Sequence, residues 1–148
     1  MNARTAILIV DDEEVVRHCH MRVLASVPCD VKAVRDGEQA LHEMEAQPYD
    51  VVLIDLRMPG MDGITLLKAL KAGWPESEVI VITGFPCVET AKEAIRLGAY
   101  EYLAKPVAPD EVINAASSAL KQKHWTLRRA NQTNSTRGAR AQAISAAL

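Results

Sequence analysis

The sequence has few cysteines and no long apolar run. Its three cysteines, Cys19, Cys29 and Cys87, are an odd number and form no CxxC motif. They are typical of small buried side chains in a reducing compartment, not of a disulfide framework. No apolar stretch approaches the ~20 residues of a membrane-spanning helix, and the first apolar run ends at Asp11, so the N-terminus lacks a signal-peptide pattern. We therefore expect a cytoplasmic protein that does not span a membrane.

Acidic residues are missing from the end of the chain. All nineteen acids lie at or before Glu111, whereas six of the seventeen bases follow it, so residues 1–111 carry −8 and the remainder +6. The net charge is only −2, which argues against a general binder of nucleic acids or membranes. Residues 123–148 are also too few for a helix-turn-helix domain and lack interleaved aromatic residues. Direct nucleic-acid binding is therefore not expected.

Five short apolar runs are present and predict five strands. They are Ala6–Val10, Val31–Val34, Val51–Ile54, Val79–Thr83 and Ala99–Ala104. The first, third and fourth are almost purely apolar, as are strands that are buried on both faces of a parallel sheet.

Each run is followed by a segment in which apolar residues recur at helical spacing. In the first segment Val15, Cys19, Val23 and Val27 form one apolar stripe, which Pro28 ends. Shorter stripes follow the next runs, formed by Ala40, Leu41 and Met44, by Ile64, Leu67 and Leu70, and by Val88, Ala91 and Ile95. Strands that alternate with helices predict an α/β fold, a doubly wound parallel sheet with helices on both faces.

The fifth helix is predicted to continue past the sheet. It begins near Pro109 and keeps helical spacing as far as Leu127. Beyond Ala130 the composition changes to Asn, Gln, Thr, Ser, Arg and Gly, which is typical of disordered or linker segments. We predict one domain over residues 1–122, followed over residues 123–148 by a helical extension and then a basic, flexible tail or linker.

Four of the five predicted strands end in residues of complementary chemistry. Asp11 and Asp12 follow the first strand, Asp55 follows the third, Thr83 ends the fourth, and Lys105 follows the fifth. Because the carboxyl ends of parallel strands share one edge of the sheet, these side chains are expected to converge. Taken singly, each is explained by a helix cap or an exposed position. Taken together, they predict a functional site.

The converging residues suit phosphoryl transfer to an aspartate. Three neighbouring carboxylates repel one another unless a cation joins them, and Mg²⁺ prefers oxygen ligands. A carboxylate can also attack phosphorus and form an acyl phosphate. Lys105 and the Thr83 hydroxyl supply a cation and a donor for the charge on the transferring group. The strand ends therefore predict a Mg²⁺-dependent site in which Asp55 is the phosphate acceptor.

Four segments with these residues resemble bacterial response-regulator receiver domains of two-component signal transduction. They are residues 9–13 (IVDDE), 55–63 (DLRMPGMDG), 82–84 (ITG) and 98–106 (GAYEYLAKP), in the order and at the spacing of that family. The resemblance spans nearly all of residues 5–122 and implies a flavodoxin-like (βα)₅ fold with a five-stranded parallel sheet. The stretch from Gly84 to Pro106 is similar to receivers of enhancer-binding transcription activators and of hybrid kinases.

The resemblance implies specific roles for the acidic residues. Asp55 would be the phosphoacceptor. Asp12 and Asp55 would bind Mg²⁺ directly, together with the backbone carbonyl of Arg57, and Asp11 would act through water. Arg57 and Phe85 lie two residues beyond Asp55 and Thr83, where family members tune the lifetime of the phosphate. A bulky cation and a ring at these positions favour slow loss of phosphate.

The resemblance also implies how the site would signal. Thr83 would bind a phosphoryl oxygen, Lys105 would pair with the phosphoryl group, and the Lys105–Pro106 peptide bond would be cis. Tyr102 matches the aromatic residue that turns inward when the threonine moves toward the phosphate. An ordinary edge aromatic is the alternative reading of Tyr102. The surface of the fourth helix, fifth strand and fifth helix would then change its preferred partner.

The expected partners follow from the same resemblance. The phosphoryl group would come from a histidine kinase or a phosphotransfer protein, and the output would be a missing or separate effector. A homodimer through the fourth helix, fifth strand and fifth helix is also predicted. The domain would not be an enzyme for other substrates, because it would catalyse only its own phosphorylation and dephosphorylation.

Three other functions compete with this reading. A Mg²⁺ phosphatase with an aspartate nucleophile usually has a second aspartate two residues further on, where this chain has Arg57. A flavodoxin-like cofactor binder needs a donor-rich phosphate loop after the first strand, whereas residues 11–14 (DDEE) would repel phosphate. A phosphate-independent interaction domain remains if the acidic residues serve structure alone.

Overall fold

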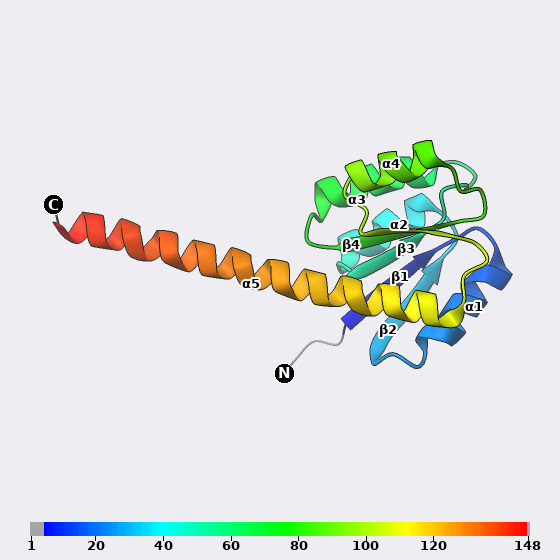
Figure 1. The fold of residues 1–148 in the computed structure, drawn as a ribbon, viewed down its shortest axis with the longest axis horizontal. Helices are drawn as coiled ribbons and strands as arrows, with labels where there is room; N and C mark the ends of the chain where they lie inside the picture. Colours follow the sequence, from blue (N-terminus) through cyan, green and yellow to red (C-terminus); the bar gives the residue numbers. More distant parts are fainter. Residues whose placement is uncertain (1–4, 148) are drawn as a thin grey trace.

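The computed structural model describes the backbone of residues 5–147 and the side chains of residues 5–125 and 127–129. Strands and helices alternate along the whole of this range (Figure 1). The strands are β1 (Thr5–Val10), β2 (Cys29–Val34), β3 (Val51–Ile54), β4 (Glu78–Thr83) and β5 (Glu101–Ala104). The helices are α1 (Glu14–Leu24), α2 (Gly37–Ala46), α3 (Gly63–Gly73), α4 (Val88–Arg96) and α5 (Pro109–Ala147).

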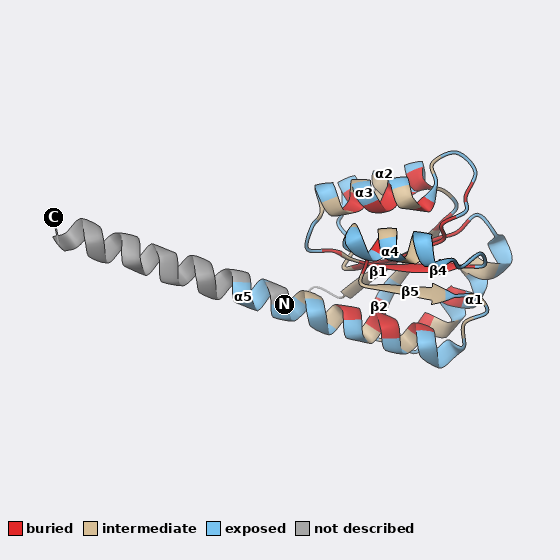
Figure 2. Ribbon diagram, turned by 45° about the horizontal axis from the view of Figure 1, so that its top comes forward, coloured by how far each residue is buried: buried red, intermediate tan, exposed pale blue. Residues whose placement is uncertain are grey.

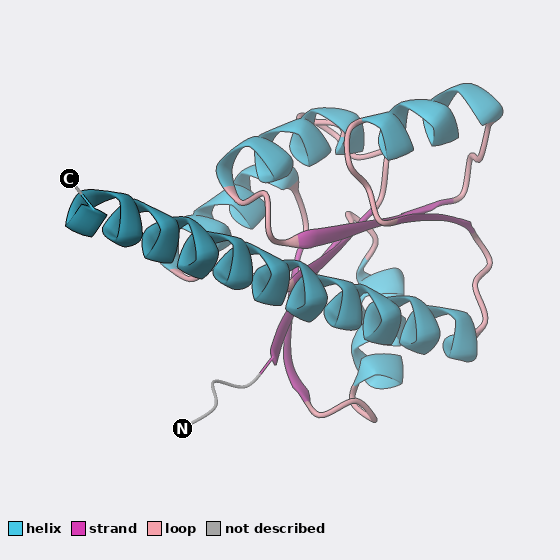
Figure 3. Ribbon diagram, turned by 60° about the vertical axis from the view of Figure 1, so that its left-hand side comes forward, coloured by secondary structure: helices cyan, strands magenta, loops and turns pink. Residues whose placement is uncertain are grey.

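The five strands form one parallel sheet in the order β2-β1-β3-β4-β5. Helices α1 and α5 cover one face, and α2, α3 and α4 cover the other (Figures 2 and 3). The predicted doubly wound, flavodoxin-like fold is confirmed. The winding direction reverses between β1 and β3, and in such sheets the functional crevice lies at the carboxyl ends of the strands at this reversal.

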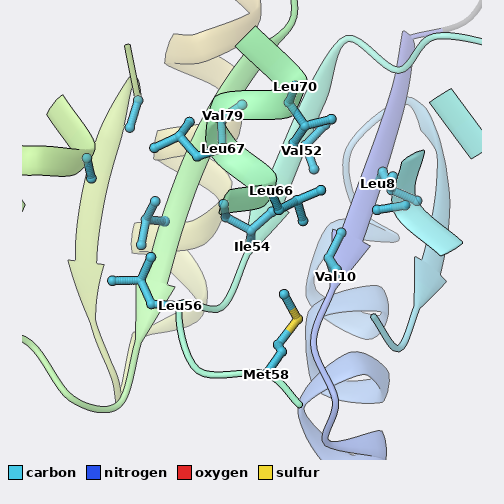
Figure 4. Packing of buried hydrophobic residues seen from close by; sticks show 14 of the residues in the cluster. Leu8, Val10, Val52, Ile54, Leu56, Met58, Leu66, Leu67, Leu70 and Val79 are labelled. Carbon is cyan, nitrogen blue, oxygen red and sulfur yellow. The ribbon is translucent and has the colours of Figure 1, made fainter. Parts of the chain in front are cut away.

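Two apolar cores hold the layers together. On the α2–α4 face, Leu8 and Val52 from the sheet pack against Leu66, Leu67 and Leu70 of α3 (Figure 4). On the other face, Leu24 of α1 and small residues of α5 pack against β1, β3 and β4. Full burial of a leucine or isoleucine contributes about 1.5–3 kcal/mol, so the completely buried runs in β1, β3 and β4 fix the centre of the sheet.

Only the second half of the stripe predicted for the first helix packs against the core, where it is partly buried. Val15 is 73% exposed and Cys19 is also exposed, whereas the buried residues of α1 are His20 and Leu24. The helix ends at Leu24, so Val27 lies outside it. Residues at four-residue steps drift by about 40° around a helix, and packing against the sheet selects the neighbouring face.

Helix α4 likewise leaves two of its three predicted apolar residues exposed. Val88 is 69% exposed and Ile95 is 52% exposed, and Ala94 is the buried residue of the helix. A small side chain at the contact lets the helix lie close to the sheet. The outer surface of α4 therefore carries an apolar strip.

Helix α5 buries Val112, Ala115, Ala116 and Ala119 in its first part. Its backbone stays helical to Ala147, past the point where the composition predicts a flexible segment (Figure 3). A division of the chain at residue 122 and flexibility beyond it stay predictions. No helix in the described part of the chain combines the length and apolar character needed to cross a bilayer.

Candidate functional site

Strand register brings the predicted acidic residues together. Val10 of β1 is paired with Ile54 of β3, so Asp11 and Asp55 leave the sheet side by side. The hydrogen bonds between neighbouring strands continue one residue past the strand ends. The Asp55 amide donates to the Val10 carbonyl at 3.1 Å, and the Asp11 amide donates to the Val34 carbonyl at 3.2 Å. Both side chains are buried, with residue exposures of 3% for Asp11 and 6% for Asp55.

Three carboxylates share this edge of the sheet. Asp11, Asp12 and Asp55 each offer an oxygen, and these oxygens lie within 4.8 Å of one another. Asp12 is exposed, so the cluster is open to solvent on that side. Oxygen ligands with one open side suit a hard cation such as Mg²⁺, which keeps several waters. The donor set therefore fits the predicted ion.

Lys105 joins the two buried carboxylates. Its Nζ donates to Asp11 Oδ2 at 3.0 Å and to Asp55 Oδ2 at 3.1 Å. Burial favours the neutral amine, but the hydrogen bonds and charges of the two aspartates outweigh this effect and raise the pKa of Lys105 above its ordinary value. Lys105 is therefore a fixed positive charge beside Asp55. The Lys105–Pro106 peptide bond is cis, the isomer that the resemblance implies.

Backbone donors hold the other carboxylate oxygens. Asp11 Oδ1 accepts from the Glu13 amide at 2.9 Å, and Asp55 Oδ1 accepts from the Arg57 amide at 3.2 Å. These bonds within the loops orient each carboxylate. Lys105 and the Arg57 amide donate to different oxygens of Asp55, so both carboxylate oxygens are hydrogen-bonded.

Gly63 is required for the loop that follows Asp55. A Cβ at this position would lie 2.4 Å from the Asp55 carbonyl oxygen and 2.5 Å from the Leu56 Cα. Its amide donates to the Leu56 carbonyl at 2.9 Å. The start of α3 therefore packs directly on the loop that follows Asp55. Sequence reasoning treated Gly63 only as part of a motif, and its contact role was missed because it depends on the loop geometry.

Thr83 ends β4 at the same edge and is fully buried. The β4–β5 pairing of Thr83 with Ala104 places Lys105 one residue further on, and the Lys105 amide donates to the Thr83 carbonyl at 2.7 Å. The Thr83 hydroxyl oxygen accepts from the Phe85 amide at 3.1 Å. A movement of this hydroxyl would therefore break this hydrogen bond or shift the loop that carries Phe85.

Arg57 and Phe85 form a contact between two loops of the site. The guanidinium carbon of Arg57 lies 3.9 Å from the centre of the Phe85 ring, a cation–π geometry. Arg57 comes from the loop after Asp55 and Phe85 from the loop after Thr83, so the pair bridges the two strand ends. Phe85 itself is 60% exposed, which places the pair on the outer surface.

The Tyr102 hydroxyl is bound to the first turn of α4. It lies 2.8 Å from the Thr90 hydroxyl oxygen, and the Cys87 amide donates to it at 3.3 Å. Cys87 also caps α4, since its Sγ accepts from the Thr90 amide at 3.4 Å. Hydrogen bonds from Thr90 lower the pKa of the Cys87 thiol. The sequence analysis missed Thr90, and the only signal for it was the spacing of Cys87 and Thr90 at a helix start.

An apolar hollow of about 650 Å³ lies beside the acidic residues, between α1 and the segment before α5. Val16, Val23, Pro106 and Val112 line it, together with Lys105 and the nearly buried His20. His20 Nδ1 is buried without a hydrogen-bond partner among the described residues, and burial lowers the pKa of His20. Sequence reasoning missed His20 because a histidine within a helix carries no signal of burial.

The chain matches the family model of the response regulator receiver domain over residues 7–117. The chain belongs to the response-regulator receiver family. Regulatory protein AtoC of Escherichia coli is 40% identical over 121 residues, which are 82% of this chain and 26% of that protein. Transcriptional regulatory protein ZraR of the same species is 39% identical over 120 residues, 80% of this chain and 27% of that protein.

Solved structures agree with the family assignment. NtrX from Brucella abortus superposes with a TM-score of 0.82 at 30% identity, covering 88% of this chain and 30% of that one. The chain thus spans about a quarter of the length of the curated relatives named above. It is a receiver domain of the two-component type, which is a signalling domain.

Proposed function

We propose that this receiver accepts a phosphoryl group on Asp55 from the phosphohistidine of a histidine kinase or phosphotransfer protein. The observation that carries the proposal is the cluster of three carboxylates with oxygens within 4.8 Å of one another, two of them joined by Lys105. An Asp55 oxygen would attack phosphorus and form an acyl phosphate, while the bond from phosphorus to the donor nitrogen breaks. The histidine is released as the leaving group.

The remaining residues of the site would stabilise the transferring group. Asp12, Asp55 and the Arg57 carbonyl would hold Mg²⁺ directly, and Asp11 would hold it through water. When bound, the ion would supply positive charge for the phosphoryl oxygens. Lys105 would exchange its bond to Asp55 for one to the phosphoryl group, and the Thr83 hydroxyl would donate to a phosphoryl oxygen.

Phosphorylation would act on the surface formed by α4, β5 and α5. The acyl phosphate carries about −2 charge where the free carboxylate carries −1, and this added negative charge attracts the Thr83 hydroxyl and with it the loop that carries Phe85. Tyr102 would then leave its partners on α4 and turn inward. Because Val88 and Ile95 already expose an apolar strip on α4, we propose this surface as the site of homodimerisation or effector contact.

The donor protein would approach on the side of α1. The apolar hollow next to Lys105 and the exposed Val15 lie beside the acceptor, so an apolar surface of the donor can pack there while its histidine reaches Asp55. Arg57 and Phe85 would shield the acyl phosphate from water, which predicts slow loss of phosphate.

The test is the intact mass of the full chain after incubation with Mg²⁺ and acetyl phosphate, beside an Asp55→Asn variant. One phosphoryl adduct on the wild type, absent from the variant and prevented by chelating Mg²⁺, is the expected result. If acetyl phosphate fails, a histidine-phosphorylated phosphotransfer protein is used as the donor. No adduct from either donor, with no Mg²⁺ binding, would contradict the proposal and favour a phosphate-independent interaction domain.

A further inference from the structure

An ionic contact lies at the edge of the sheet opposite Asp55. Asp50, just before β3, forms an ion pair with Lys123 of α5. Its other carboxylate oxygen accepts from the Ala6 amide at 2.8 Å. The Asp50 amide donates to the Ala6 carbonyl at 2.9 Å, and the Asp50 carbonyl accepts from the Glu78 amide at 3.0 Å. Asp50 therefore connects β1, β3, β4 and α5.

Lys123 lies where α5 leaves the body of the domain. Ala119 is fully buried and Leu120 is half-buried, and the side chain of Lys123 is only 12% exposed. Among the later residues of α5 whose side chains are described, all are exposed, including Trp125 at 52% and Leu127 at 39%. Lys123 is thus the last of these α5 residues whose side chain is largely buried, and α5 continues beyond it (Figure 1).

We propose that the Asp50–Lys123 ion pair is the joint that fixes helix α5 to the sheet and sets the direction in which the helix leaves the domain. The body of the receiver then extends to Lys123, one residue beyond the predicted boundary at residue 122. The acid-free segment that follows is presented in an orientation set by the strands. The inference does not depend on phosphorylation of Asp55.

The surroundings favour a charged joint over an apolar one. Glu78 adds a second acid near Lys123, and burial raises the pKa of Glu78, an effect that Lys71 and Lys123 partly offset. Lys71 itself donates to the carbonyls of Pro75 and Ser77. Lys123 is therefore the cation that faces the Asp50 carboxylate. A lysine stem also covers apolar surface while its ammonium reaches the acid, which suits a helix that is leaving its core.

Hydrogen exchange of the full chain tests this joint. Lys123→Met keeps the stem but removes the charge, and Lys121→Met makes the same change at an exposed position two residues earlier. We expect amides of residues 121–129 to exchange about tenfold faster in Lys123→Met, since local opening no longer has to break the ion pair. Lys121→Met should exchange as the wild type does. Amides of β3 and β4 serve as the internal reference for an intact body.

Asp50→Asn separates the joint from a general folding defect. Its amide oxygen can still accept from Ala6, but the charge that holds Lys123 is gone. This variant should match Lys123→Met, and the double variant should exchange no faster than either single one. Equal exchange in Lys123→Met and Lys121→Met would overturn the inference. Because acetyl phosphate labelling of Asp55 should be unchanged in all these variants, failure here and failure of the proposed function are distinguishable.

Discussion

Replacement of Lys105 by methionine should destabilise the metal-free domain much more than the Mg²⁺-bound one. The Lys105 ammonium makes two charge-assisted hydrogen bonds to carboxylates whose side chains are only 4% and 7% exposed. Each such bond contributes about 1.5–3 kcal/mol, and loss of one partner from a buried pair costs about 3–5 kcal/mol. Because the lysine side chain itself is 19% exposed, we expect the lower end of this range, a decrease of about 3 kcal/mol in the free energy of unfolding of the metal-free domain at pH 7.

Mg²⁺ should recover most of this loss, because the ion supplies the positive charge that Asp11 and Asp55 need. If the bound form loses only about 1 kcal/mol, linkage requires Mg²⁺ to bind the folded variant more tightly by about 2 kcal/mol, roughly 30-fold. Urea unfolding in chelator and in saturating Mg²⁺ measures both quantities. Lys92→Met, at an exposed position on α4, is the control for loss of a charge.

Equal destabilisation of Lys105→Met with and without Mg²⁺, together with an unchanged Mg²⁺ affinity, would refute this reasoning. Lys105 would then act by packing alone. The acidic cluster would not be the cation site that the donor set indicates.

Three further predictions concern other parts of the molecule. Burial lowers the pKa of His20 below its ordinary 6.5, so near this pH the unfolded chain binds more protons than the folded one. The free energy of unfolding should therefore fall as the pH drops below about 6.5. Urea unfolding at several pH values should show a flatter curve over this range for His20→Leu. Gly63→Ala should lower the free energy of unfolding by about 3 kcal/mol and slow phosphorylation, because the new Cβ would lie 2.4 Å from a backbone oxygen. Gly73→Ala is the control: its Cβ would meet no atom within 4 Å, so its free energy of unfolding should stay within about 1 kcal/mol of the wild type. Arg57→Ala and Phe85→Ala should each shorten the half-life of the acyl phosphate in Mg²⁺, followed by intact mass; rapid loss from the wild type itself would contradict the shielding role.

The sequence predicted the sheet well because its strands are extreme in composition. The runs in β1, β3 and β4 are short, rich in β-branched residues and apolar on both faces, which is the pattern of a buried parallel strand. It predicted the amphipathic helices less well. In α1 the sequence favoured Val15 and Cys19, and the structure buries His20 and Leu24. A helix stripe fixes an approximate face, but the final rotation depends on the side chains of the sheet beneath it.

The residues of the site were found from strand ends, since a parallel sheet brings all carboxyl ends to one edge. Their pairing was not. Lys105 binds both Asp11 and Asp55 because the β4–β5 register and the loop before α5 bring its side chain between them. The contact of Arg57 with Phe85 likewise requires two loops to meet.

The sequence by itself determined the alternation of strands and helices and which residues converge at the carboxyl edge, because these depend on local pattern and on the parallel connection. Only the tertiary structure decided that His20 is buried, that Gly63 lies against the loop after Asp55, and that Lys123 meets Asp50, 73 residues away in the sequence. Such contacts join segments far apart in the chain, and no local propensity encodes the distance between them.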